Sequence, residues 1–138
     1  MVGVGFAEEV RRQLRQRMRR ISEVVEEAWG EVPQGIFFWS RYALRLGTIL
    51  GAEVEPAPSW GVPGEVLREV KELIGWEGSD LALRFWVRAL RIRFVDMPGL
   101  VFWLVFDYHE GGLPPNFSLV VIHEAPSSRS SDSSCRRG

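Results

Sequence analysis

Apolar residues near the start of the chain recur at spacings of three and four, the pattern of an amphipathic helix. They run from Phe6 to Ala28, and most positions between them are charged. Gly30, Pro33 and Gly35 then interrupt the pattern. The first segment therefore predicts a helix over residues 6–29 that is followed by a connector.

The next segment, residues 36–50, is apolar on nearly all sides, as expected of a helix in the middle of a fold. Its clearly polar members, Arg41 and Arg45, are one turn apart, so they share a face that must reach solvent or a carboxylate. We interpret Gly51 as the C-terminal cap of this helix. Alternatively, Gly47 and Gly51 together could admit another element at close range.

Residues 52–62 contain Pro56, Pro58 and Gly61, which predicts a rigid loop around Trp60. Pro63 suits the first turn of a third helix, and Gly75 suits its end. Apolar residues between them keep helical spacing, while glutamates cover the other face. A third helix is therefore expected over residues 63–75.

The periodicity changes to two after residue 80, which predicts strands over residues 81–94, bent or turned near Ala89. Met97, Pro98 and Gly99 form a turn signal. Residues 100–108 are almost continuously apolar, as in a central strand covered on both faces. The glycines and prolines of residues 110–116 predict irregular structure. Residues 117–123 are predicted to form the last strand.

These elements predict an α+β fold in which three N-terminal helices pack on a three- to four-stranded antiparallel sheet. We expect a single domain over residues 1–125. From Pro126 onward the composition is dominated by serine and arginine, which predicts a disordered tail over residues 126–138.

Composition excludes several classes of protein. The chain has 138 residues, of which 46% are hydrophobic and 25% charged, enough for a core without disulfides or structural metal. Its single cysteine, Cys135, excludes a disulfide framework and a thiolate-rich zinc site. A net charge of -1 argues against binding nucleic acid through bulk charge.

Residue usage and the N-terminal segment suggest the kind of host organism and the cellular compartment of the protein. Lys71 is the only lysine, and amides are few, which fits either a thermophilic host or the coding bias of a GC-rich genome. Residues 1–6 show no signal peptide, and the longest apolar run, Gly99–Phe106, is far shorter than a membrane span. We therefore expect a cytoplasmic protein.

Acids and histidines gather near the C-terminal strands, where a metal site would be conceivable. If the last two strands pair around a loop at 110–116, His109 lies opposite Phe117 and His123 opposite Trp103. The two histidines are then about 20 Å apart and cannot share one zinc ion. We interpret His109, His123 and Glu124 as residues at strand ends, without an assigned role.

No catalytic signature is visible either. Asp107 and Glu124 lack the lysine of a nuclease motif, because Pro126 stands in its place. No serine lies in a nucleophile-elbow sequence, and the glycines at positions 3 and 5 follow no strand. The sequence predicts no catalytic residue, no metal ligand and no cofactor.

The first helix carries the main basic cluster of the chain. Such a helix can bind RNA or another anionic surface, but its arginines can equally form a solvated face paired with nearby glutamates. A winged helix is disfavoured because the outer face of residues 63–75 is acidic. The cluster consists of Arg11, Arg12, Arg15, Arg17, Arg19 and Arg20.

Aromatic residues are more numerous than a core of this size requires, with six tryptophans and eight phenylalanines. The excess could line a pocket, form an interface or simply pack the core. Our first hypothesis is a non-catalytic, sensory or small-ligand-binding module with an apolar pocket between the second helix and the sheet. Its candidate ligand-binding residues are Phe37, Trp39, Arg41, Arg45, Trp60, Trp76 and Trp86.

The alternative hypothesis is a structural or interaction subunit of a homo- or hetero-oligomer, burying Trp86 and the strand at residues 100–106 against its partner. The expected partners are thus an apolar small molecule, a second copy or another protein. A membrane span is not expected, and an RNA or anion partner at the first helix ranks last.

The order of several features resembles the 4-vinyl reductase domain, a family related to trafficking subunits of the TRAPP type. The resemblance rests on residues 42–51, on residues 66–76 and on the strand end at residues 91–96, and it covers about residues 36–96. It implies an α+β fold that binds small molecules. The family's closing glutamate and spaced cysteines are not reproduced after Glu124, so no site residue is carried over.

Overall fold

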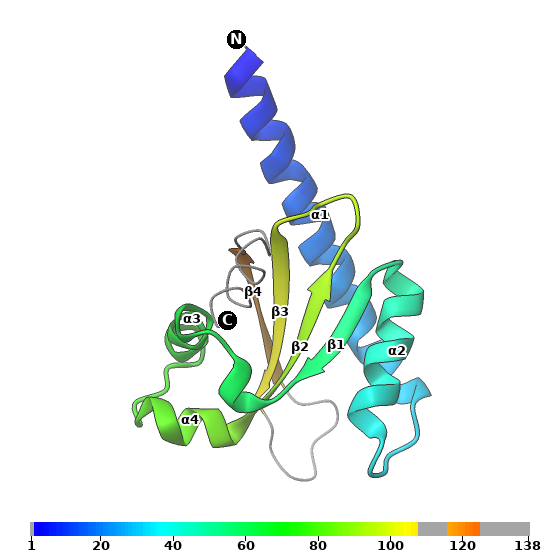
Figure 1. The fold of residues 1–138 in the computed structure, drawn as a ribbon, viewed down its shortest axis with the longest axis vertical. Helices are drawn as coiled ribbons and strands as arrows, with labels where there is room; N and C mark the ends of the chain where they lie inside the picture. The colour runs from blue at the N-terminus through cyan, green and yellow to red at the C-terminus, as the bar shows by residue number, and fades with distance from the viewer. Residues whose placement is uncertain (1, 108–115, 125–138) are drawn as a thin grey trace, which may run out of the picture. The chain divides into compact units, whose positions relative to one another are not determined.

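The computed structural model describes residues 2–107 and 116–124. It divides into two compact units, Met1–Ala52 and Glu53–Gly138, and each is described by itself. His109, the loop at 110–115, Cys135 and the predicted tail at 126–138 lie outside the described residues. Figure 1 shows the order of the elements along the chain.

The first unit consists of two helices, α1 (Val2–Glu31) and α2 (Phe38–Leu50). Both predicted helices are confirmed within a few residues. Gly51 caps α2 with a left-handed backbone (φ 65°), and its N–H donates to the Gly47 carbonyl at 2.8 Å. Glycine adopts this conformation without the penalty that a Cβ would bring, so the capping role predicted for Gly51 is confirmed.

The two helices of this unit differ greatly in length. At about 1.5 Å per residue, α1 extends about 45 Å and α2 about 20 Å. Contacts join α2 to the C-terminal half of α1: the Tyr42 hydroxyl donates to the Val25 carbonyl at 2.9 Å, and the rings of Trp29 and Phe38 lie 4.6 Å apart. Within the first unit, α2 is too short to reach the N-terminal turns of α1.

The second unit contains a four-stranded antiparallel sheet with the strand order β1-β2-β3-β4, visible in Figure 1 as neighbouring arrows. Its strands are β1 (Glu53–Ala57), β2 (Val87–Arg93), β3 (Leu100–Asp107) and β4 (Asn116–His123). Six consecutive residues of β3, from Val101 to Phe106, are buried, as expected of a strand with neighbours on both sides. The α+β class is confirmed.

Three helical segments complete this unit: the short η1 (Ser59–Gly61), α3 (Gly64–Ile74) and α4 (Asp80–Trp86). One core joins apolar side chains of α3 and α4 to alternate residues of β2, β3 and β4. Among the latter are Val87, Trp103 and Val120. Because side chains alternate along a strand, α3 and α4 cover a single face of the sheet.

Two predicted elements are wrong. Residues 52–62 are not a loop throughout, because residues 53–57 pair with β2 as an edge strand, where Pro56 is tolerated. The strand predicted from residue 81 begins only at Val87, since residues 80–86 form α4. The Ser79 side chain caps that helix by accepting from the Ala82 N–H at 3.1 Å, a local signal that outweighs the apparent alternation of residues 81–86.

The predicted register of the last two strands is also wrong. His123 lies opposite Leu100 and Trp103 opposite Val120, a shift of three residues from the expected pairing. The strands extend to Asp107 and Asn116, which pair with each other. The prediction placed the turn from the glycines and prolines alone, and these do not determine where the ladder ends.

Candidate functional site

Four of the predicted ligand-binding residues belong to the first unit. Phe37 is 61% exposed just before α2, whereas Trp39 is half-buried. Arg41 is exposed on α2. Arg45, also exposed, donates through Nε to a Glu31 carboxylate oxygen at 2.5 Å, and this hydrogen bond raises the pKa of Arg45. The prediction that the arginine face reaches solvent or a carboxylate is thus confirmed.

The aromatic residues of the first unit pack against one another. The Trp39 ring lies 5.6 Å from Trp29, 5.3 Å from Phe38 and 6.1 Å from Tyr42, each time edge to face. Such contacts stabilise each ring pair by about 0.5–1.5 kcal/mol beyond simple burial. Within this unit, therefore, much of the aromatic excess is used for packing.

The other three predicted residues, Trp60, Trp76 and Trp86, belong to the second unit. Trp76 is half-buried against the core, and its Nε1 donates to the Ser79 carbonyl at 3.1 Å. Trp86 ends α4 and is 43% exposed. Trp60 is 80% exposed on η1. Within this unit, Trp76 serves packing, whereas Trp60 and Trp86 present much of their surface to solvent.

Helix α4 exposes two further large apolar side chains, Leu81 at 65% and Phe85 at 79%. They are four residues apart and therefore share one face of the helix, while Leu83 turns into the core. Arg84, on an adjacent face, fixes α4 to η1: its Nη1 donates to the Ser59 carbonyl at 2.7 Å and to the Val62 carbonyl at 2.9 Å.

Trp60, Leu81 and Phe85 thus lie on two elements that are bonded to each other, and we call these three residues the α4 patch. Single apolar residues on a surface are ordinary, but large apolar side chains that share one face, as Leu81 and Phe85 do, mark an interaction site. Aromatic side chains with most of their surface free are also typical anchors of protein interfaces. The α4 patch is the candidate functional site of the second unit.

The segment that separates Trp60 from Leu81 in the chain is acidic. Residues 64–80 hold five acids and two bases, a net charge of -3. Lys71 pairs with Asp80 at 3.0 Å, so its charge is already matched. Glu69, Glu72 and Glu77 are exposed. A partner surface with basic residues around an apolar centre would complement this arrangement.

Leu81 and Phe85 were missed as surface residues because the sequence pattern assigned them to a strand. A signal for the helix is present, since Ser79 precedes an acidic first-turn residue, Asp80, as helix N-termini often show. The i, i+4 spacing of Leu81 and Phe85 then predicts a shared face. Only the folded unit shows that this face points away from the core.

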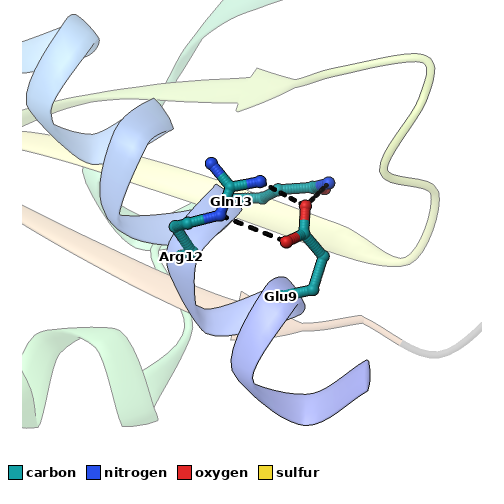
Figure 2. A network of polar contacts seen from close by, with 3 residues as sticks. All are labelled: Glu9, Arg12 and Gln13. Atoms are coloured by element: carbon teal, nitrogen blue, oxygen red, sulfur yellow. Dashed lines mark hydrogen bonds and ion pairs between the residues drawn. The ribbon is translucent and has the colours of Figure 1, made fainter. Parts of the chain in front are cut away.

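The basic cluster on α1 is exposed at Arg11, Arg12, Arg15, Arg19 and Arg20. Figure 2 shows that Arg12 and Gln13 both bond to Glu9, with Gln13 Nε2 at 2.9 Å. The hydrogen bond from Arg12 lowers the pKa of Glu9. One positive charge is therefore matched by a carboxylate of the same helix, and RNA or anion binding by the others stays a prediction.

An open hollow of about 520 Å³ runs beside this part of α1 and is lined by charged residues of both signs. Every residue described along it carries a charge, so the lining is unsuited to the apolar ligand that the first hypothesis requires. The residues described along it are Glu8, Glu9, Arg11, Arg12 and Arg15.

Ion pairs cross the face of the sheet on which α3 and α4 pack. Arg91 on β2 bonds to Glu55 on β1, which lowers the pKa of Glu55. Arg93, two residues further, donates to Glu124 at 2.5 Å. Glu124 thus has a structural partner beyond the end of β4. The described residues include no group of three or more histidines, cysteines or acids arranged to hold a metal ion.

The comparisons with known proteins identify no relative. No protein-family model, no curated protein and no solved structure matches the chain. The resemblance to the 4-vinyl reductase domain therefore stays a prediction, as does the binding of an apolar small molecule. None of the described helices combines the length and apolar character that a bilayer crossing requires.

Proposed function

We propose that the protein is a non-catalytic interaction subunit that docks another protein on the α4 patch. The observation that carries the proposal is the exposure of Trp60, Leu81 and Phe85, each at 65% or more, on two elements held together by Arg84. Covering such side chains releases water from apolar surface, the main favourable term in protein association.

The partner we propose is a protein surface with an apolar centre and arginine or lysine residues around it. Charge complementarity supports this choice, because residues 64–80, which separate Trp60 from Leu81 in the chain, have a net charge of -3. Opposite charges at the rim accelerate the encounter and disfavour acidic competitors, while the apolar centre supplies most of the affinity.

Site-specific photo-crosslinking in the native host tests the proposal. A photoreactive residue at position 85 should capture a partner, and the same residue at position 95 should not, although Val95 is 95% exposed in the same unit. The partner is then purified, and its dissociation constant is measured by titration.

The double variant Leu81→Ser/Phe85→Ser should weaken binding at least about a hundredfold, because truncation of a hot-spot anchor costs about 2 kcal/mol or more. The matched control Val95→Ser should leave the dissociation constant unchanged. Equal affinity of the double variant and the wild type would contradict the proposal, as would a partner with an acidic contact surface.

A further inference from the structure

The two edges of the sheet differ in how they are protected against pairing with another strand. β1 is short and carries Glu53, Glu55 and Pro56. Proline offers no backbone N–H, and charged side chains on an edge discourage a further strand. At this edge, therefore, the sequence itself opposes association.

β4 has none of these protections. It is eight residues long, and from Asn116 to His123 it contains no proline, glycine, lysine, arginine or acid. Within the part of the chain that the structure describes, β4 pairs with β3 alone. The side chains of Phe117, Leu119, Val121 and Ile122 are only half-buried. A long, uncharged edge rich in β-branched residues is a template for pairing.

We propose that β4 pairs antiparallel with β4 of a second copy of this chain, across a two-fold axis. Side chains on one face must lie opposite side chains on the same face, so the axis lies at a residue and not between two residues. Leu119 and Val120 are the central residues of β4, and an axis at either of them pairs most of the strand. Leu119 then faces either its own copy or Val121 of the second copy. Every cross-strand pair formed within β4 is free of carboxylate, lysine and arginine side chains, so no fixed like charges oppose each other.

The other ways of pairing the sheet edges of two copies are less favourable. Self-pairing of β1 about Val54 would place Glu53 opposite Glu55 of the other copy, and like charges in that position are destabilising. Pairing of β1 with β4 of a second copy leaves one edge open at each end and adds copies without limit. Self-pairing of β4 uses the unprotected edge and closes after two copies.

This association is separate from the α4 patch, since α4 is not part of either sheet edge. A partner could therefore bind the patch of each copy while the two sheets are joined. Pairing of β4 with a second copy does not require docking on the α4 patch, and docking does not require the pairing.

Hydrogen exchange on the wild-type chain is the first test, combined with sedimentation at a series of concentrations. We expect a reversible dimer whose formation protects alternate β4 amides, those directed away from β3, while β1 amides keep their exchange rates. A chain that stays monomeric across the high-micromolar range would overturn the proposal. So would a dimer in which the β4 amides exchange as in the monomer.

Charge substitution at the axis is the second test. Leu119→Lys places two ammonium groups close to each other in either alignment, so the dimer should dissociate several-fold more readily. Leu119→Glu should do the same. An equimolar mixture of the two variants should regain the dimer, because opposite charges then face each other.

Two controls keep this second test decisive. Val54→Lys introduces the same charge at a half-buried position of the opposite edge strand and should leave dimerisation unchanged. Leu81→Ser/Phe85→Ser should also leave it unchanged, which separates this proposal from docking on the α4 patch. If the lysine and glutamate variants fail to fold, the exchange measurement on the wild type still decides. A folded mixture that remains monomeric would refute the β4 pairing.

Discussion

Tyr42 shows how one polar atom is accommodated in the first unit. Its side chain is fully buried, and its hydroxyl donates to the Val25 carbonyl at 2.9 Å. A buried hydroxyl without a partner would destabilise the fold, so this hydrogen bond matters more for avoiding a penalty than for its own strength. Burial raises the pKa of Tyr42 well above its ordinary value.

Tyr42→Phe should lower the free energy of unfolding by about 0.5–1.5 kcal/mol near neutral pH, because one buried hydrogen bond is lost. The folded state disfavours the tyrosinate, so stability is complete below the ordinary pKa of 10.0 and falls as the pH rises above it. Denaturant titrations from pH 7 to 11 should show a shallower alkaline loss for Tyr42→Phe. Parallel curves for the two proteins would contradict this.

The ion pair between Glu55 and Arg91 makes the stability of the fold depend on pH in the acid range. The hydrogen bond from Arg91 lowers the pKa of Glu55, so the stabilisation is present above the ordinary pKa of 4.5 and is lost as the pH falls through the lower pKa of the folded state. Glu55→Gln should cost up to about 1 kcal/mol at pH 7, since both side chains are partly exposed. Thermal melts should show this difference vanish in acid, and the control Glu53→Gln should cost less at pH 7.

At the scale of elements, α4 is decided by its capping residue and its surroundings together. The seven residues of α4 are too few for a stable isolated helix. The Ser79 cap, the bonds from Arg84 to η1 and the burial of Leu83 fix it in place. The exposure of Leu81 and Phe85 follows, because the remaining face has nothing in this unit to cover it.

Ser79→Ala should destabilise the chain by about 1 kcal/mol, because the Ala82 N–H loses its acceptor. Ser22→Ala is the matched control. The Ser22 hydroxyl bonds to the Met18 carbonyl within α1, a contact that does not favour helix, so alanine there should be neutral or slightly stabilising. Chemical denaturation measures both variants. Equal losses would show that the cap does not hold α4.

At the scale of the whole molecule, the local stability of each strand should follow its place in the sheet. β3 is hydrogen-bonded on both sides, and six of its residues are buried. Amides of β3 should therefore exchange most slowly of all strands, whereas β1, a short edge strand, should exchange fastest. Native-state exchange resolved by residue checks this order. Slow exchange in β1 would mean that a further strand protects that edge.

The sequence predicts an element well where one regular pattern ends at a clear boundary. Gly51 and Gly75 close α2 and α3 with positive φ, as their positions suggested. The prediction fails at residues 81–86, where apolar residues alternate but the Ser79 cap favours a helix. It fails again at residues 53–57, because an edge strand with a proline and two glutamates has almost no apolar pattern of its own.

The sequence by itself determined the α+β class, the existence of β3 and β4, and the glycine caps of α2 and α3. It also determined that the shared face of Arg41 and Arg45 reaches solvent or a carboxylate. These features follow from periodicity and from local backbone preferences. Only the tertiary structure decided the register of β3 and β4, the exposure of the α4 patch and which strands form the edges of the sheet. Each of these depends on contacts between residues distant in sequence, and no local pattern records them.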